Sequence, residues 1–338
     1  MGVEFIPYSP KNMITNRLIN KAMKNLIVIL LFLLVQSGFA QYNLKNLSLE
    51  TESGTKVHEF ENLRLYPIRA NQAFVSNHRE VGKYITLKEA LDRKKVVITE
   101  TGNGRSGGGT VNTLLVENIS SEPVMILSGE VVQGGKQDRM IAKDVVIHPR
   151  SGKVKVDVYC VEHGRWQAKK DGMSFNEYSN VSSNEVRKAG VVNKNQSEVW
   201  DKVAETTSKN RAETATGTLT ALDGSGSFKN SVAKYKSHFQ AALDSEKDVV
   251  GMVVVSGDKV LGCDMFASHE LFIQHFTNLI NAYAAEAITS GSKATLSRSK
   301  VDLYLRTLLE DENKQAQELE KRGTMLKDKD MKLHLSAF

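Results

Sequence analysis

The sequence is short of cysteine, of long apolar runs and of net charge. Its 338 residues contain two cysteines, Cys160 and Cys263, both within hydrophobic, strand-like stretches. The sequence is therefore compatible with either a single disulfide that closes a long loop or two buried free thiols. The longest apolar run, residues 26–35, has ten residues and is too short to span a bilayer. We therefore expect no integral membrane segment in the mature chain.

The first forty residues have the features of a secretory signal peptide. Met23 and Lys24 precede the apolar run, and small residues at 37–40 follow it. A charged start, a short apolar centre and a small-residue exit are typical of such peptides. We interpret residues 1–40 as the signal peptide, with Met23 as the true start and Gln41 as the mature terminus. The sequence thus predicts an exported protein, either periplasmic or secreted.

The mature chain has little net charge. Four basic residues and one acidic residue lie in the first forty, which leaves 41 basic against 38 acidic residues and a net charge of +3. This excess is small and scattered, so it indicates no nucleic-acid partner. The remaining 298 residues suit one large domain or two of ordinary size.

The middle of the chain is rich in short strand-like segments. Turn residues separate them at intervals typical of an antiparallel β-sandwich or barrel. The segments are residues 62–68, 96–100, 111–119, 124–127, 141–147 and 154–161. The glycine-rich stretch 101–110 lacks the lysine and hydroxyl residue of a phosphate-binding loop and is followed by a strand, so we interpret it as a hairpin loop.

The C-terminal half is predicted to add a hairpin and packed helices, which makes the fold class α+β. Residues 249–255 and 259–266 form the hairpin, and Ser268 begins a helix with one broad apolar face. A further helix is expected over 300–321. We divide the mature chain into an N-terminal arm at 41–57, a single domain at 58–322 and a tail at 323–338.

Two polar, glycine-rich clusters stand out against this background. The first is residues 129–139 and the second is residues 160–166. An amide, a carboxylate and a guanidinium within three residues suit a polar ligand or a fixed loop. The candidate binding residues from both clusters are Gln137, Asp138, Arg139, His163, Arg165 and Trp166.

Period-two alternation places Cys160 and Glu162 on the same face of their strand, in line with three valines. A core thiol is the simpler interpretation of Cys160, and a nucleophile is the alternative. A buried carboxylate needs a partner, so Arg139 or Arg165 should reach Glu162. Such a pair either ties two strand ends together or takes part in function, and the sequence leaves both interpretations open.

Glu130 and Glu162 are the candidate catalytic residues. Hydrolysis of glycosidic bonds requires two carboxyl groups that face a shared gap, and these two glutamates could supply them. His148, His163 and Glu162 are a candidate metal set, but they lack a fourth ligand, and we predict no metal or cofactor. Trp166 either stacks on a ligand or plugs the end of the barrel.

Together the two clusters resemble the signature of the ARG and Rhodanese-Phosphatase-superfamily-associated protein domain. The residues that carry the resemblance are Gly129, Glu130, Gly134-Gly135-Lys136-Gln137-Asp138-Arg139, Cys160-Val161-Glu162 and Gly164-Arg165-Trp166. The likeness covers about residues 58–310. It implies no particular activity. His163 stands where a glutamine or similar polar residue is expected, so the resemblance implies no histidine-based mechanism.

The leading hypothesis is an exported binding or interaction module with a polar pocket for a small polar or anionic ligand, or for a protein partner. The first alternative is a hydrolase that uses Glu130 and Glu162 as its acid and base. The second is that the clusters serve only to hold the sheet together. A gap of about 5–10 Å between the two carboxyls would favour the enzyme.

Overall fold

A computed structural model describes residues 2, 42–50, 58–102, 111–170, 172–243 and 246–338. The predicted signal peptide, residues 51–57 of the predicted arm and most of the glycine-rich loop lie outside these residues. Gln41–Phe338 forms one unit of antiparallel sheets and packed helices, which confirms the α+β class. No helix among the described residues has both the length and the apolar character of a membrane span.

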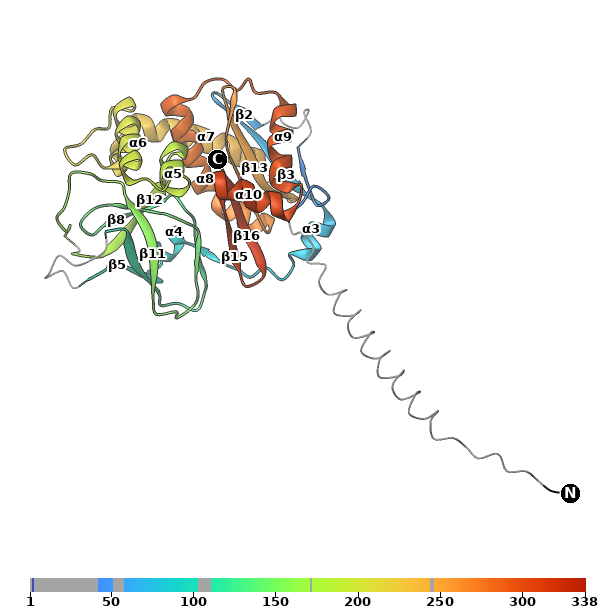
Figure 1. Ribbon diagram of the computed structural model, residues 1–338. Coiled ribbons are helices and arrows are strands. Elements are labelled where there is room, and N and C mark those ends of the chain that lie inside the picture. The colour runs from blue at the N-terminus through green and yellow to red at the C-terminus, as the bar shows by residue number, and fades with distance from the viewer. Residues whose placement is uncertain (1, 3–41, 51–57, 103–110, 171, 244–245) are drawn as a thin grey trace. The chain divides into compact units, whose positions relative to one another are not determined.

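One half of this unit, the sheet lobe, is built on a seven-stranded antiparallel sheet (Figure 1). The order is β1-β3-β13-β14-β16-β15, with β2 paired to β3. The predicted hairpin is the β13–β14 pair, which turns at Gly257 with a φ of 60°. The strands are β1 (Leu47–Leu49), β2 (Glu59–Phe60), β3 (Leu63–Ala70), β13 (Val249–Ser256), β14 (Lys259–Phe266), β15 (Gly323–Asp328) and β16 (Met331–Ala337).

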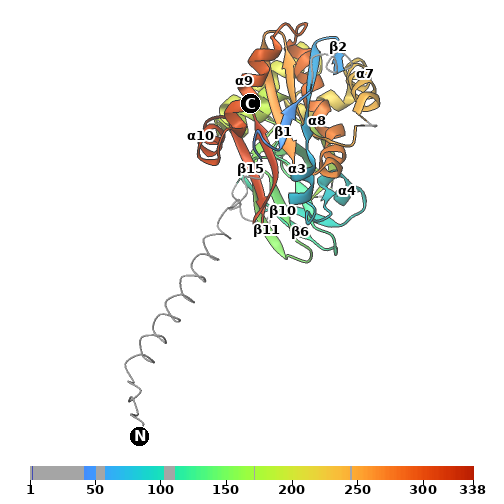
Figure 2. The same ribbon diagram turned by 90° about the vertical axis from the view of Figure 1, so that its right-hand side faces the viewer.

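Helices cover both faces of this sheet (Figure 2). Met252 and Val254 pack into the core on one face, and Val253 and Val255 pack into the core on the other. Successive strand residues point to opposite faces, so a strand covered on both sides needs an unbroken apolar run. The helices are α7 (Gly226–Leu243) and α8 (His269–Ser290) on the first face, and α3 (Gln72–Asn77), α9 (Arg298–Leu309) and α10 (Glu312–Arg322) on the second.

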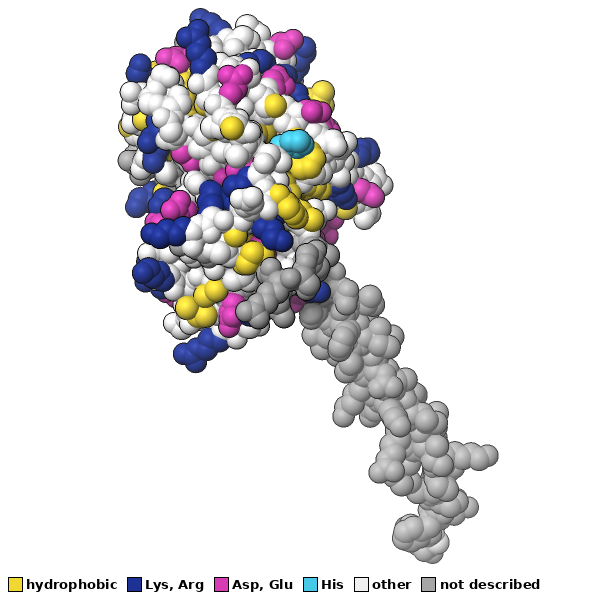
Figure 3. Space-filling view, turned by 90° about the vertical axis from the view of Figure 1, so that its left-hand side faces the viewer, with side chains coloured by type: hydrophobic (Ala, Val, Ile, Leu, Met, Phe, Trp, Pro, Cys, Tyr) yellow, Lys and Arg dark blue, Asp and Glu magenta, His cyan; other side chains and the backbone are white. Residues whose placement is uncertain are grey.

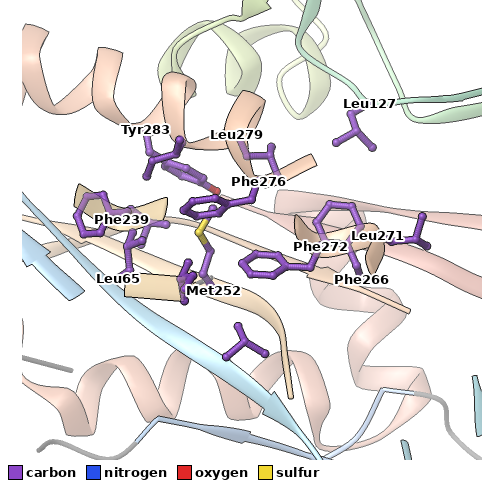
Figure 4. Close-up of a cluster of buried hydrophobic side chains, with 14 of the residues drawn as sticks. Leu65, Leu127, Phe239, Met252, Phe266, Leu271, Phe272, Phe276, Leu279 and Tyr283 are labelled. Atoms are coloured by element: carbon purple, nitrogen blue, oxygen red, sulfur yellow. The ribbon is translucent and has the colours of Figure 1, made fainter. Parts of the chain in front are cut away.

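Helix α8 begins where the sequence indicates. The Ser268 hydroxyl accepts a hydrogen bond from the Leu271 N–H at 3.2 Å, as an N-cap does. Its predicted apolar face packs against the sheet, where Phe276 and Tyr283 lie with Met252 (Figure 4).

The other half, the barrel lobe, is a curled six-stranded sheet in the order β12-β8-β9-β11-β6-β5. Its two edge strands approach through a bridge between Thr99 and Ser174. A small sheet of β10, β7 and β4 and the helix α4 (Leu87–Asp92) complete its core. The strands are β4 (Ile85–Thr86), β5 (Val96–Glu100), β6 (Thr113–Asn118), β7 (Val124–Ile126), β8 (Glu130–Gly134), β9 (Arg139–Ile141), β10 (Val145–Ile147), β11 (Lys153–Cys160) and β12 (Phe175–Val181).

A layer of short helices covers the outside of the barrel lobe. It consists of α5 (Asn184–Val191), α6 (Gln196–Lys209) and the 3-10 helix η2 (Leu219–Gly224). Val131 of β8 is paired with Met140 of β9, and both pack against this layer. The next residue, Val132, points to the barrel core.

Three segments differ from the sequence expectations. Residues 323–338 are not a tail but form β15 and β16, in which buried Leu333, Leu335 and Ala337 alternate with polar residues. The helix expected over 300–321 is two helices, because Asp311 accepts a hydrogen bond from the Lys314 N–H and begins α10. The third segment is residues 167–194, a polar stretch for which the sequence predicts no helix or strand; it contains β12 and α5, whose apolar residues are too few to show a clear period.

Candidate functional site

The two sequence clusters lie together at one end of the barrel lobe, joined by Arg165. Its Nη1 donates to the Gly135 carbonyl at 2.6 Å, and its Nη2 donates to the Gly134 carbonyl at 3.1 Å. Nη2 also lies 3.1 Å from Asp138 Oδ1, and Nε lies 2.9 Å from Glu162 Oε2. We call Gln137, Asp138, Arg139, Glu162 and Arg165 the signature cluster.

The turn from β8 to β9 sets this geometry. Gly134 and Gly135 have φ values of 144° and 46°, which side chains other than glycine rarely adopt. A Cβ on Gly135 would lie 2.5 Å from Cζ of Phe175. Glycine at position 135 therefore allows a close approach of the backbone, and Phe175 is the neighbour that requires it.

Asp138 is the centre of the signature cluster. Its Oδ1 accepts from the Gly134 N–H at 3.1 Å and from Lys169 Nζ at 2.9 Å, in addition to Arg165. Its Oδ2 accepts from the hydroxyls of Thr218 and Thr220 at 3.0 and 2.9 Å. The side chain is 1% exposed. A buried carboxylate with this many donors is fully satisfied and has little capacity left for a ligand.

Glu162 is also buried and paired. Its Oε2 accepts from the Asp138 N–H at 3.1 Å, and Arg165 supplies the cation that the sequence predicts for it. Arg139, the other candidate cation, lies 3.3 Å from Glu100 and donates to the Gln137 carbonyl at 2.9 Å. Glu162 therefore belongs to a closed ion-pair network, which agrees with the structural interpretation of the pair.

His163 and Trp166 face outward. The ring of His163 meets Trp200 edge-on at 4.6 Å, and its carbonyl accepts from Gln137 Nε2 at 3.2 Å. Trp166 is 54% exposed, with Lys136 Nζ 5.2 Å from its ring centroid, so it does not plug the barrel. His148 lies 3.3 Å from Asp328, away from both. Among the described residues no cluster of His, Cys, Asp and Glu could hold a metal ion.

Glu130 lies at the opposite end of its strand from the signature cluster. The β-ladder pairs Val132 with Arg139 and Arg139 with Cys160, so Glu130 and Glu162 are four residue rows apart, roughly 13 Å of strand. Glu130 instead accepts from the Leu127 N–H at 2.8 Å and the Tyr178 hydroxyl at 3.2 Å. No described interaction joins the two carboxyls, and this arrangement gives no support to a shared catalytic gap.

Burial dominates the titration of Glu130. Desolvation raises its pKa to about 8, against the lowering effect of the hydrogen bonds from Leu127 and Tyr178. Cys160 and Cys263 are both free and buried, and burial raises the pKa of each thiol. Such thiols are poor nucleophiles, which fits the core interpretation of Cys160.

A second set of buried charges, absent from the sequence interpretation, joins the two lobes. His334 Nδ1 lies 2.5 Å from Asp144 of the barrel lobe, and its Nε2 lies 3.1 Å from Asp264 of the sheet lobe. Arg187 of α5 lies 3.6 Å from Asp264, to which the Tyr283 hydroxyl donates at 2.6 Å. We call these five residues the interlobe network.

The interlobe network is buried and balances its own charge. Burial lowers the pKa of His334, but Asp144 and Asp264 outweigh this effect and raise it to about 9. Burial acts to raise the pKa of both carboxyls, yet the neighbouring cations hold each below its ordinary value. At neutral pH two carboxylates therefore face an imidazolium and a guanidinium. Gly129, with a φ of 88°, packs so closely against Arg187 that an added Cβ would lie 2.5 Å from Cγ of that arginine.

An apolar cavity of about 210 Å³ lies where the lobes meet. Its walls come from β8, β12 and η2 on the barrel side and from α7 and α8 on the sheet side. We call it the interlobe cavity. The apolar residues that line it are Val131, Val181, Leu219, Leu222, Phe228, Val232, Ala233 and Ala285.

Polar groups gather along part of this cavity. Ser183 lines it and is 3% exposed, and its hydroxyl has no hydrogen-bond partner among the described residues. Lys229 and Lys236 of α7 also line it, and neither forms an ion pair within the described part of the chain. Asp223 accepts from Ser179 Oγ at 2.5 Å. An apolar cavity with a few convergent polar groups is the usual form of a small-molecule site.

Several residues of the site could not be found from sequence. Glu100, Lys169, Thr218 and Thr220 complete the signature cluster from distant segments. The threonines lie in a stretch whose composition is that of an exposed linker, and nothing in that composition distinguishes a buried hydroxyl from a solvated one.

Fold and site together define a two-lobed α+β protein in which a closed ion-pair cluster braces the wall of an apolar cavity. Residues 52–336 match the ARG and Rhodanese-Phosphatase-superfamily-associated Protein domain, ARPP-1, and the chain belongs to this family. The match extends the predicted range to include β15 and nearly all of β16. The comparisons with curated proteins and with solved structures gave no match.

Proposed function

We propose that this protein is an exported binding module that holds a small molecule in the interlobe cavity. The single observation that carries the proposal is the cavity itself, with apolar walls, two lysines that form no ion pair with any described residue and a buried serine hydroxyl that has no partner among them. A cavity of about 150 Å³ lined by apolar side chains binds benzene, so about 210 Å³ suits one ring or a short chain.

The signature cluster supports this cavity from behind. Asp138 holds Thr218 and Thr220, which lie at the start of η2, and η2 contributes Leu219 and Leu222 to the cavity wall. Asp138, Glu162 and Arg165, which the sequence assigns to a pocket, are hydrogen-bonded to one another. The proposed ligand site is therefore the cavity, and the cluster is its brace.

Two larger hollows fit a ligand less well. One, of about 720 Å³, lies near Tyr84 and the start of α8, and its wall carries charges of both signs, including Arg79 and Asp248. The other, of about 560 Å³, lies between Tyr159 and α10. Both hollows have a more polar lining than the interlobe cavity, and displacing water from polar walls yields less affinity than displacing it from apolar ones.

Export rests on the sequence of residues 1–40, with Met23 as the start and Gln41 as the mature terminus. Expression in a bacterial host with a periplasm, followed by mass spectrometry of the intact protein, tests this part. A periplasmic or secreted product that begins at Gln41 is expected. A cytoplasmic product that retains the apolar run contradicts export.

Blocking the cavity tests the binding site. Ala233 and Ala241 are both exposed on α7, but only Ala233 lines the cavity. We expect the wild type and Ala241→Trp to bind an eight-carbon probe, octanoate or 1-octanol, with a Kd of roughly 0.1–1 mM by calorimetry. Ala233→Trp should lose binding while keeping its melting temperature. No binding of either probe to the wild type contradicts the proposed function.

A further inference from the structure

We infer that the ligand of the interlobe cavity is a small monocarboxylate with an apolar body of roughly six to eight carbon atoms. This inference rests on the proposed function and adds the chemical class of the ligand. It depends on how charge is distributed along the wall of the cavity.

The apolar body follows from the walls and the size. Val131, Leu219 and Leu222 close the barrel side, and Phe228 and Val232 close the α7 side. Each buried methylene contributes roughly 0.8 kcal/mol by leaving water, so a chain or ring of this size supplies most of the affinity. A longer chain extends past the apolar walls into solvent, and a fully polar ligand leaves those walls without contacts.

The carboxylate follows from the lysines of α7. Lys229 and Lys236 are seven residues apart, which places them two turns apart on the same face of the helix. Neither has an ion pair within the described residues; Lys229 is exposed and Lys236 is half-buried. Two lysines at the cavity without a counterion in this part of the chain suit an anion, and flexible four-carbon stems let both head groups reach the same one.

Asp223 sets the direction in which the ligand lies. It is the acidic residue among those that line the cavity, and it accepts from Ser179 Oγ at 2.5 Å, Asn180 Nδ2 at 3.1 Å and Gln133 Nε2 at 3.4 Å. These donors hold it against β12. A second carboxylate beside it would be repelled, so the ligand's carboxylate is placed at α7 and its apolar end between β8 and η2.

Three probes with eight carbon atoms each separate this inference from the proposed function. Octanoate, 1-octanol and octylamine have similar apolar tails and differ in the head group, which is a carboxylate, a neutral hydroxyl and an ammonium. The full mature chain is titrated with each by calorimetry, together with the double variant Lys229→Gln/Lys236→Gln. Lys234→Gln is the matched control, because Lys234 is exposed on α7 and does not line the cavity.

We expect the wild type to bind octanoate more tightly than 1-octanol, and octylamine most weakly. The double variant should weaken octanoate about ten-fold and 1-octanol less than two-fold, while Lys234→Gln changes neither. Equal affinity for octanoate and 1-octanol, or tightest binding of octylamine, overturns the carboxylate inference and leaves the binding function standing. Loss of both acid and alcohol binding in the wild type overturns both.

Discussion

The signature cluster and the interlobe network both bury charged side chains, but they differ in how far apart their residues lie along the chain. All five residues of the signature cluster lie between positions 137 and 165, within one lobe. The interlobe network joins Asp144 to His334, 190 residues away, across two lobes. The first network fixes a turn and a cavity wall, whereas the second fixes one sheet against another. Breaking the interlobe network should therefore lower the free energy of unfolding more than breaking the signature cluster.

The largest effect is expected from His334→Gln. This change removes a buried cation and leaves Asp144 and Asp264 close together without full compensation. We expect the free energy of unfolding to fall by about 3–5 kcal/mol in urea denaturation. The control is His148→Gln, since His148 is 56% exposed and should change stability by less than about 0.5 kcal/mol. Similar losses in the two variants would show that the interlobe network does not stabilise the fold.

The pH dependence of His334 should be nearly as large. Its folded pKa of about 9 lies above its ordinary value of 6.5. Its contribution is therefore fully present below pH 6.5 and is lost as pH rises through 9, a change of about 3 kcal/mol. NMR titration of the His334 ring, with unfolding free energies measured from pH 6 to 10, checks this. A ring that titrates near 6.5 contradicts the ion pairs.

Glu130 also makes the stability depend on pH, over a range that overlaps that of His334. Its pKa of about 8 also lies above the ordinary value of 4.5, so its contribution is present below pH 4.5 and is lost as pH rises through 8. Glu130→Gln removes that part of the slope and leaves the part from His334. The loss of stability between pH 5 and 8 should therefore be smaller in Glu130→Gln than in the wild type.

A smaller effect is expected in the signature cluster from Arg165→Lys. Lysine keeps the charge but cannot reach the Gly134 and Gly135 carbonyls together with Glu162. We expect a loss of about 2 kcal/mol in urea denaturation. Lys170→Arg, at an exposed position, should change nothing measurable. A loss as large as that of His334→Gln would remove the difference between the two networks.

The smallest effect isolates one contact of the β8–β9 turn. Gly135 and Gly152 both have positive φ, but only the former lies against Phe175, and nothing lies within 4 Å of a Cβ on Gly152. Gly135→Ala should lower the melting temperature more than Gly152→Ala, by the equivalent of roughly 1–2 kcal/mol. Equal shifts would mean that the turn yields to the added methyl group.

The contrast between the two networks also explains which features of the fold and the site can be predicted from the sequence. The meeting of residues 129–139 with 160–166 could be predicted, because Glu162 interrupts an apolar line of its strand and arginines lie nearby. The β13–β14 hairpin and the start of α8 follow from alternation and a serine cap. These signals are local, and local patterns determine turns, caps and strand pairs.

The interlobe network has no local signal. Asp144 lies in the connection between β9 and β10, Arg187 in a polar helix and His334 in a segment whose sequence predicts a tail. Each residue type at such a position is usually solvated, and only the packing of the two lobes buries it. The interlobe cavity is hidden for the same reason, since β8, η2 and α7 contribute its walls from separate stretches of chain.

The position of a bound probe tests the proposed site most directly. Crystals of the mature protein with 8-bromooctanoate allow the bromine to be located by its anomalous scattering. A bromine peak between Leu219 and Leu222, with the carboxylate near Lys236, is expected. A peak beside Arg165 and Trp166 would contradict the cavity as the ligand site and return the function to the signature cluster.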